Sequence, residues 1–291
     1  MIKYLVLSGG GPTGFLTYGV LRYLAKTEYW KLEDIKGIYG TSVGAIIGLI
    51  ISLNYEWEEL NDYLIKRPWN QIINHNSINL TNIMTKKGIF ESDIFIEILN
   101  PLLSAKDLDI NITFQELYDY NQIDFHIYAT SLNTDNLEKI DISHKTHPKL
   151  KIIDGIAMTA AYPFIFSPVK NDEDYYIDGG MLNVFPLNDC LEQTSCDENE
   201  ILAIRNINKR NNNKINDNSS MVDLLIILLK KLQYNICSQE AQKKIQNIVY
   251  CDANKLYDFQ KWIDVLYSEE ERIKLIIEGE QFAELYYNYI N

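Results

Sequence analysis

The N-terminal part of the chain repeats one local pattern twice: a short apolar run, a glycine-rich turn and an apolar helix. The runs at residues 3–7 and 35–39 predict strands, and segments 14–26 and 45–53 carry apolar residues at helical spacing. A strand–helix–strand–helix order produces parallel strands joined by right-handed crossovers. The sequence therefore predicts an α/β fold, with a mostly parallel central sheet and helices on both faces.

Further strands are predicted later in the chain. Residues 125–132 and 138–142 are rich in β-forming side chains and predict a hairpin. A short strand is predicted at 175–177. A further one is predicted at 201–207, which we expect to be the last strand of the sheet.

The composition changes after residue 207. Residues 208–220 are nearly all polar and predict a linker or loop, and residues 221–291 are patterned as helices. We therefore expect an α/β domain over residues 1–207, the linker, and a helical C-terminal extension. The extension carries one apolar stripe formed by Leu224, Leu228 and Leu232, and further apolar surface at Trp262, Leu266 and Tyr267. We expect these side chains to pack on the domain, and the alternative is that the helices cover the site or touch a membrane.

Charge and cysteine usage limit the partners and the location. The net charge of −13 argues against nucleic acid, whose binding depends on cations that neutralise phosphates. The four cysteines form no C-x-x-C pair and the histidines do not cluster at the spacing of a zinc site, so we expect no metal. We expect no cofactor either. The apolar runs are too short to span a bilayer, and no leader pattern is evident. We expect a cytoplasmic protein that meets membranes only peripherally.

The sharpest motif is Gly40-Thr41-Ser42-Val43-Gly44, between a predicted strand and a predicted helix. A nucleophile elbow requires this context, because glycines on either side let a serine sit on a strained strand-to-helix turn. The helix N-terminus also favours negative charge as it develops. An ordinary turn is the alternative, but the flanking strand and helix favour a nucleophile.

A second turn follows the first strand and reads Gly9-Gly10-Gly11-Pro12-Thr13-Gly14. Consecutive glycines expose backbone N–H groups that can hold an oxyanion. Gly9, Gly11 and Gly14 also fit the dinucleotide fingerprint, which makes an NAD-dependent enzyme the rival interpretation. That fingerprint requires an acidic residue at the end of the second strand, and this chain has none there.

The third motif is Asp178-Gly179-Gly180, again at a strand end. Alone it is typical of a turn, but the carboxyl ends of parallel strands converge on one crevice. The four histidines all precede Asp178, whereas the usual α/β hydrolase triad has its histidine after the acid. This order favours a carboxylate that acts directly as the base for Ser42.

The three motifs together resemble the signature blocks of patatin-like phospholipases, in the same order and at similar spacing. The stretch from Ala157 to Pro163 resembles the small-residue helix of that family, and Asn183 and Pro186 resemble the residues after its aspartate. The resemblance covers about residues 3–190. It implies a patatin-like three-layer sandwich, with residues 1–207 as the acyl hydrolase domain.

The resemblance also implies a serine hydrolase that cleaves carboxylic esters of phospholipids or other fatty acyl esters. In that mechanism Ser42 attacks the carbonyl and Asp178 takes its proton. The oxyanion would be held by the backbone of Gly9, Gly10, Gly11 and Val43. The supporting motif residues are Pro12, Thr13, Gly14, Gly40, Thr41, Gly44, Gly179 and Gly180.

One position departs from the family pattern. Thr13 stands where the family usually carries arginine or lysine. Loss of that cation weakens the oxyanion loop or changes the preference for a head group. A catalytically weak or silent lipid-binding module of the same fold is therefore the alternative function.

Overall fold

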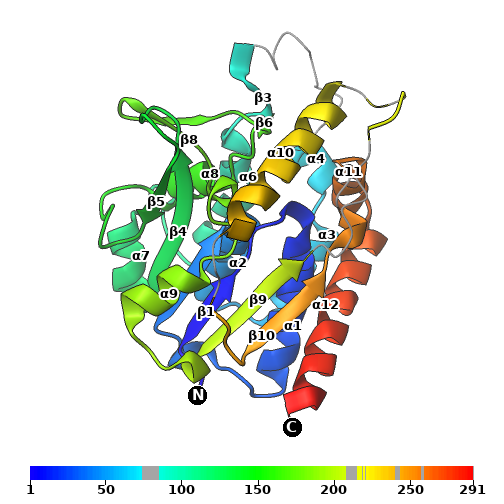
Figure 1. Ribbon diagram of the computed structural model, residues 1–291. Helices are drawn as coiled ribbons and strands as arrows, with labels where there is room; N and C mark the ends of the chain where they lie inside the picture. Colours follow the sequence, from blue (N-terminus) through cyan, green and yellow to red (C-terminus); the bar gives the residue numbers. More distant parts are fainter. Residues whose placement is uncertain are drawn as a thin grey trace.

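The computed structural model describes residues 1–73, 85–207, 215–217, 219, 221–239, 243–256 and 259–290. Figure 1 shows a central sheet with helices packed on both of its faces. Most of the predicted linker over residues 208–220 lies outside the described residues, so the linker stays a prediction.

The central sheet has eight strands in the order β10-β9-β1-β2-β4-β8-β7, with β5 on β4. Parallel pairing joins β10, β9, β1, β2 and β4, whereas β5, β8 and β7 pair antiparallel. The strands are β1 (Tyr4–Leu7), β2 (Gly37–Thr41), β4 (Asp124–Ser131), β5 (Glu138–Ile142), β7 (Val169–Asn171), β8 (Asp174–Asp178), β9 (Ile201–Ile207) and β10 (Ile248–Asp252). A separate parallel pair consists of β3 (Gly88–Phe90) and β6 (Phe164–Phe166).

The alternation of side chains along β1 shows how the layers form. Leu5 and Leu7 point into the larger core, and Val6 between them joins a second core with Leu187. The helices are α1 (Gly14–Lys26), α2 (Val43–Ser52), α3 (Trp57–Lys66), α4 (Trp69–Ile72), α6 (Asp93–Ser104), α7 (Phe114–Asn121), α8 (Ile152–Ala160), α9 (Leu187–Thr194), α10 (Met221–Gln239), α11 (Phe259–Tyr267) and α12 (Glu269–Ile290). The predicted layered α/β fold with C-terminal helices is confirmed.

The C-terminal region also contributes to the sheet. The prediction that residues 201–207 form the last strand is wrong, because β10 pairs in parallel with β9 beyond them. Helix α12 packs on α1 with almost no space between the backbones. A Cβ added to Gly19 would lie 2.1 Å from the carbonyl oxygen of Ile276, and one added to Gly279 would lie 2.2 Å from that of Leu16.

The outer face of α10 corrects a second prediction. Leu224, Leu228 and Leu232 are 43%, 50% and 46% exposed, so the stripe does not pack on the domain. The opposite face of α10 packs on the domain, since Ile226 is buried in a hydrophobic cluster with Tyr162 and Ile177. Within the described chain, every helix falls short of the length or the hydrophobicity that a membrane-spanning segment needs.

A buried charge cluster lies at the start of β4. The ring of His126 is buried, with Nδ1 2.9 Å from Asp141 Oδ1 and Nε2 3.0 Å from Asp124 Oδ1, and it stacks on Tyr39. Burial lowers the pKa of His126, but hydrogen bonds and charges from the two carboxylates outweigh it and raise the pKa to about 9. The histidine is therefore a charged structural residue.

We expect His126→Gln to lower the free energy of unfolding by roughly 3 kcal/mol at pH 6. The folded-state pKa of about 9 lies above the ordinary value of 6.5. The contribution is thus complete below about pH 6.5 and is lost as the pH rises through 9. Urea unfolding of both proteins at pH 6 and pH 10 measures it. An equal difference at the two pH values would contradict this account.

Candidate active site

Ser42 occupies a strained turn between β2 and α2. Its φ of 55° and ψ of −127° are rare for a residue with a side chain. The turn can be this tight because Gly40 and Gly44, two residues to either side of Ser42, have no side chains. A Cβ on Gly40 would lie 2.7 Å from the Ala45 nitrogen, and one on Gly44 would lie 2.3 Å from the Leu7 carbonyl oxygen. The Ser42 N–H donates a hydrogen bond to Thr159 Oγ1 at 3.0 Å, which ties the turn to α8.

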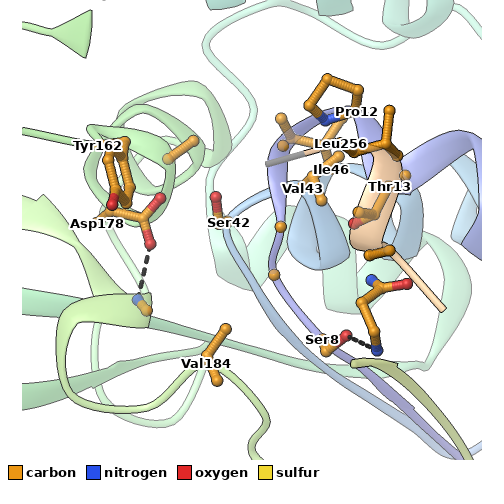
Figure 2. A pocket seen from close by; sticks show the side chains of 18 of the residues that line it. Ser8, Pro12, Thr13, Ser42, Val43, Ile46, Tyr162, Asp178, Val184 and Leu256 are labelled. Atoms are coloured by element: carbon orange, nitrogen blue, oxygen red, sulfur yellow. Dashed lines mark hydrogen bonds between the residues drawn. The ribbon is translucent and has the colours of Figure 1, made fainter. Parts of the chain in front are cut away.

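The register on β4 brings Asp178 to Ser42. Strand β2 pairs with one edge of β4 and ends where Thr41 faces Tyr128. Strand β5 occupies the other edge, so β8 continues along the β2 edge, with Asp178 facing Ala129, the next residue of β4. The end of β8 therefore meets the end of β2. Figure 2 shows the Ser42 hydroxyl and the Asp178 carboxylate facing one another.

The Asp178 carboxylate is buried, with 2% of the residue exposed. It accepts a hydrogen bond of 2.7 Å from the Gly180 N–H. Burial raises the pKa of Asp178 to about 6, and the Ser42 hydroxyl and the Gly180 N–H act in the opposite direction. Gly179 lets this turn lie on β4, since a Cβ there would be 1.9 Å from the Tyr128 carbonyl oxygen.

The glycine turn after β1 supplies backbone donors, but not all of those expected. The Gly9 N–H donates to the Val184 carbonyl at 2.9 Å, which corrects the expectation that it holds an oxyanion. Among the described residues, the N–H groups of Gly10, Gly11 and Val43 have no acceptor. Gly10 and Gly11 have φ values of 148° and 61°, conformations that favour glycine.

Thr13 is buried beneath this turn. Its Oγ1 has no hydrogen-bond partner among the described residues, and a Cβ on Gly10 would lie 2.5 Å from it. Gly14 is equally confined, because a Cβ there would lie 2.4 Å from Val43 Cγ2. Thr13 thus places a small, uncharged hydroxyl against the backbone of the turn.

A cavity of about 590 Å³ joins these groups. Most of the predicted site residues line it: Gly9, Gly10, Gly11, Pro12, Thr13, Gly14, Ser42, Val43, Asp178 and Gly180. Gly40, Thr41, Gly44 and Gly179 lie behind it and shape the turns. Apolar side chains of α2, α4 and α6 line much of the remainder, including Ile46, Trp69 and Phe95. No histidine is among the described lining residues.

The C-terminal region forms one wall of the cavity. A Cβ on Gly11 would lie 2.8 Å from the ring of Trp262 in α11, and this ring also meets Tyr162 edge to face at 6.2 Å. From α10, Gln233 Nε2 donates to the Gly180 carbonyl at 2.6 Å. The sequence offered the covering of the site by the C-terminal helices, with Trp262 among their apolar residues, only as an alternative, and no motif marks Gln233.

Hydrogen bonds from Thr41 and Asn183 support the turn that follows β2. The Thr41 hydroxyl donates to the Asn183 carbonyl at 2.8 Å, and Asn183 Nδ2 donates to Asp189 Oδ2 at 2.8 Å. Thr159, which binds the Ser42 N–H, and Asn183 both lie in stretches that resemble the patatin-like family. That resemblance was the one sequence signal that could have pointed to these supporting residues. Across the described part of the chain, His, Cys, Asp and Glu side chains form no group suited to a metal ion.

Comparisons with known proteins show similarity in sequence and in fold. The chain is 26% identical over 283 residues to a probable lipid hydrolase of Invertebrate iridescent virus 6, covering 97% of this chain and 88% of that protein. It is 39% identical over 62 residues to a cUMP-AMP-activated phospholipase of Escherichia coli, covering 20% of this chain and 19% of that protein. The fold is similar to that of VipD from Legionella pneumophila, with a TM-score of 0.50, 16% identity and coverage of 96% and 67% of the two chains.

The family model for patatin-like phospholipase matches residues 5–191. The match spans more than half of the chain and includes the turns of Ser42 and Asp178. This chain belongs to the patatin-like phospholipase family.

Proposed function

We propose that the protein is a lipid acyl hydrolase in which Ser42 is the nucleophile and Asp178 is its base. The observation that carries the proposal is the meeting of the strained serine with a buried carboxylate at one cavity. Membership of the family and the similarity to a probable lipid hydrolase support the substrate class. A fatty acyl ester also suits a cavity with largely apolar walls.

In the proposed reaction, the Ser42 oxygen attacks the ester carbonyl while its proton passes to Asp178. The tetrahedral intermediate collapses, its alcohol leaves with that proton, and an acyl group remains on Ser42. Water then attacks the acyl-enzyme, with Asp178 accepting and returning a proton, and a fatty acid is released. A carboxyl with a pKa of about 6 is ionised at neutral pH and is a stronger base than an exposed aspartate.

The backbone donors are proposed to hold the oxyanion. The N–H groups of Gly10, Gly11 and Val43 have no acceptor within the described parts of the chain. Val43 is also the first residue of α2, where the helix dipole favours negative charge. One well-aimed donor of this kind contributes roughly 3 kcal/mol to the transition state. Thr13 adds no charge, so these amides carry the stabilisation.

We expect Ser42→Ala to lower kcat on p-nitrophenyl esters and on phospholipid vesicles by at least about 10³-fold, because the acyl-enzyme can no longer form. A fluorophosphonate probe should label the wild-type protein at Ser42 and leave the variant unlabelled. Mass spectrometry of the labelled peptide provides the measurement. A wild-type protein that neither turns over esters nor reacts with the probe would favour the silent lipid-binding module instead.

We expect Asp178→Asn to lower kcat/KM by on the order of 10⁴-fold, because the amide cannot accept the serine proton. In the wild type, kcat/KM should rise with pH through about 6 as the carboxyl ionises, and then level off. Rates of p-nitrophenyl ester hydrolysis between pH 4.5 and 8.5 measure the profile. A profile without that inflection would identify a different base.

The same substitution should stabilise the fold at high pH. The folded-state pKa of about 6 exceeds the ordinary 3.8. The contribution of Asp178 to stability is therefore complete below about pH 3.8 and is lost as the pH rises through 6. At pH 8 the buried charge costs roughly 3 kcal/mol. Asp178→Asn should thus melt at a higher temperature than the wild type at pH 8, with the gap narrowing toward pH 4. A variant that melts lower at pH 8 would refute this.

A further inference from the structure

The described lining residues of the cavity include more cations than carboxylates, in contrast to the chain as a whole. The protein has a net charge of −13, yet Asp178 is the sole carboxylate among the described lining residues. Two cations line the same cavity, Arg205 from β9 and Lys230 from α10. The lining thus includes cationic side chains that the proposed hydrolysis does not use.

Arg205 is connected to the nucleophile through a short series of contacts. Its guanidinium carbon lies 5.2 Å from the centre of the Phe185 ring. The neighbouring Val184 accepts the Gly9 N–H, and a Cβ on Gly9 would lie 3.2 Å from the Ser42 Cβ and 3.5 Å from Val184 Cγ2. Arg205 is therefore placed beside the wall that carries Ser42.

The backbone around Arg205 is also fixed to the oxyanion turn. The Ser8 N–H donates to the Ile204 carbonyl at 3.1 Å, and the Asn206 N–H donates to Ser8 Oγ at 2.8 Å. Because Ser8 directly precedes Gly9, the position of Arg205 follows the position of the turn.

The Arg205 guanidinium has no carboxylate partner in the described part of the chain. It is half-buried, and burial lowers its pKa from the ordinary value. A partly desolvated cation without a counter-ion is costly, and an anionic ligand group removes that cost. A planar guanidinium matches the oxygens of a phosphate particularly well.

Lys230 supplies charge from the C-terminal wall. Its Nζ lies 5.3 Å from the centre of the Trp262 ring, and that ring covers Gly11. Arg205 and Lys230 thus approach the glycine turn from two different elements.

We propose that Arg205, assisted by Lys230, binds the phosphate of a glycerophospholipid and makes this cavity selective for phosphate-bearing esters over uncharged ones. The inference rests on the proposed function, since it concerns the substrate of the same site. Arg205 is then a specificity-determining residue, and it takes no part in the transfer of the proton or the acyl group.

The first experiment compares two esters that differ in phosphate. Arg205→Met should lower kcat/KM on monomeric dihexanoyl-phosphatidylcholine by about 10- to 100-fold, as expected for loss of a charged hydrogen bond, and leave p-nitrophenyl butyrate within about 2-fold. Arg205→Lys should recover part of the loss. The matched control is Lys231→Met, an exposed neighbour of Lys230 outside the cavity lining, which should behave as wild type, whereas Lys230→Met should not.

Two outcomes would overturn the proposal. An equal loss on both esters would make Arg205 structural, and no loss on either would leave it without a role. A wild-type protein that cleaves neither ester defeats the proposed function, and the phosphate site is then decided by binding.

That second experiment uses Ser42→Ala protein and calorimetry. Dihexanoyl-phosphatidylcholine should bind at least about 10-fold more weakly when Arg205→Met is added. Inorganic phosphate and glycerophosphocholine serve as separate probes. If inorganic phosphate alone depends on Arg205 and the lipid does not, the site binds free phosphate and the head-group assignment is wrong.

Discussion

The arrangement of the site depends on one shared strand edge. Strands β2 and β8 follow one another along the same side of β4, the first parallel to it and the second antiparallel. The ends of β2 and β8 meet there, and they carry Ser42 and Asp178. A shift of β8 by one residue would turn the carboxylate to the opposite face of the sheet, because side chains alternate along a strand. Sheet register, rather than loop geometry, thus positions these two groups.

Close backbone contacts allow the two turns to lie directly on neighbouring strands. Gly44 rests on the Leu7 carbonyl and Gly179 rests on the Tyr128 carbonyl, so both turns lie on neighbouring strands without intervening side chains. The tight fit keeps Ser42 at a positive φ and keeps water from Asp178. Strain at the serine and an elevated pKa at the carboxylate therefore have a common origin in packing that excludes even a methyl group.

Sequence reasoning could foresee the parts of the site that are local. Ser42, Asp178 and the glycines lie in short motifs at strand ends, and parallel strands bring such ends together. It missed β10, since a short apolar run among helical patterns is ambiguous. Helical spacing showed that Leu224 and Leu228 share a face, but could not show that this face points to solvent. The positions of Trp262 and Arg205 depend on tertiary packing and leave no mark in the local sequence.

The cavity is assembled from two stretches of the chain. Ser42 and Asp178 lie within residues 5–191, the part that the family model matches, while Trp262 and Lys230 come from the region that follows. That region is joined to the rest through β10 and α12, and Gln233 also donates a hydrogen bond to the Gly180 carbonyl in the turn that follows Asp178. Substitutions in the C-terminal third can therefore change the shape of the cavity while the turns of Ser42 and Asp178 stay the same.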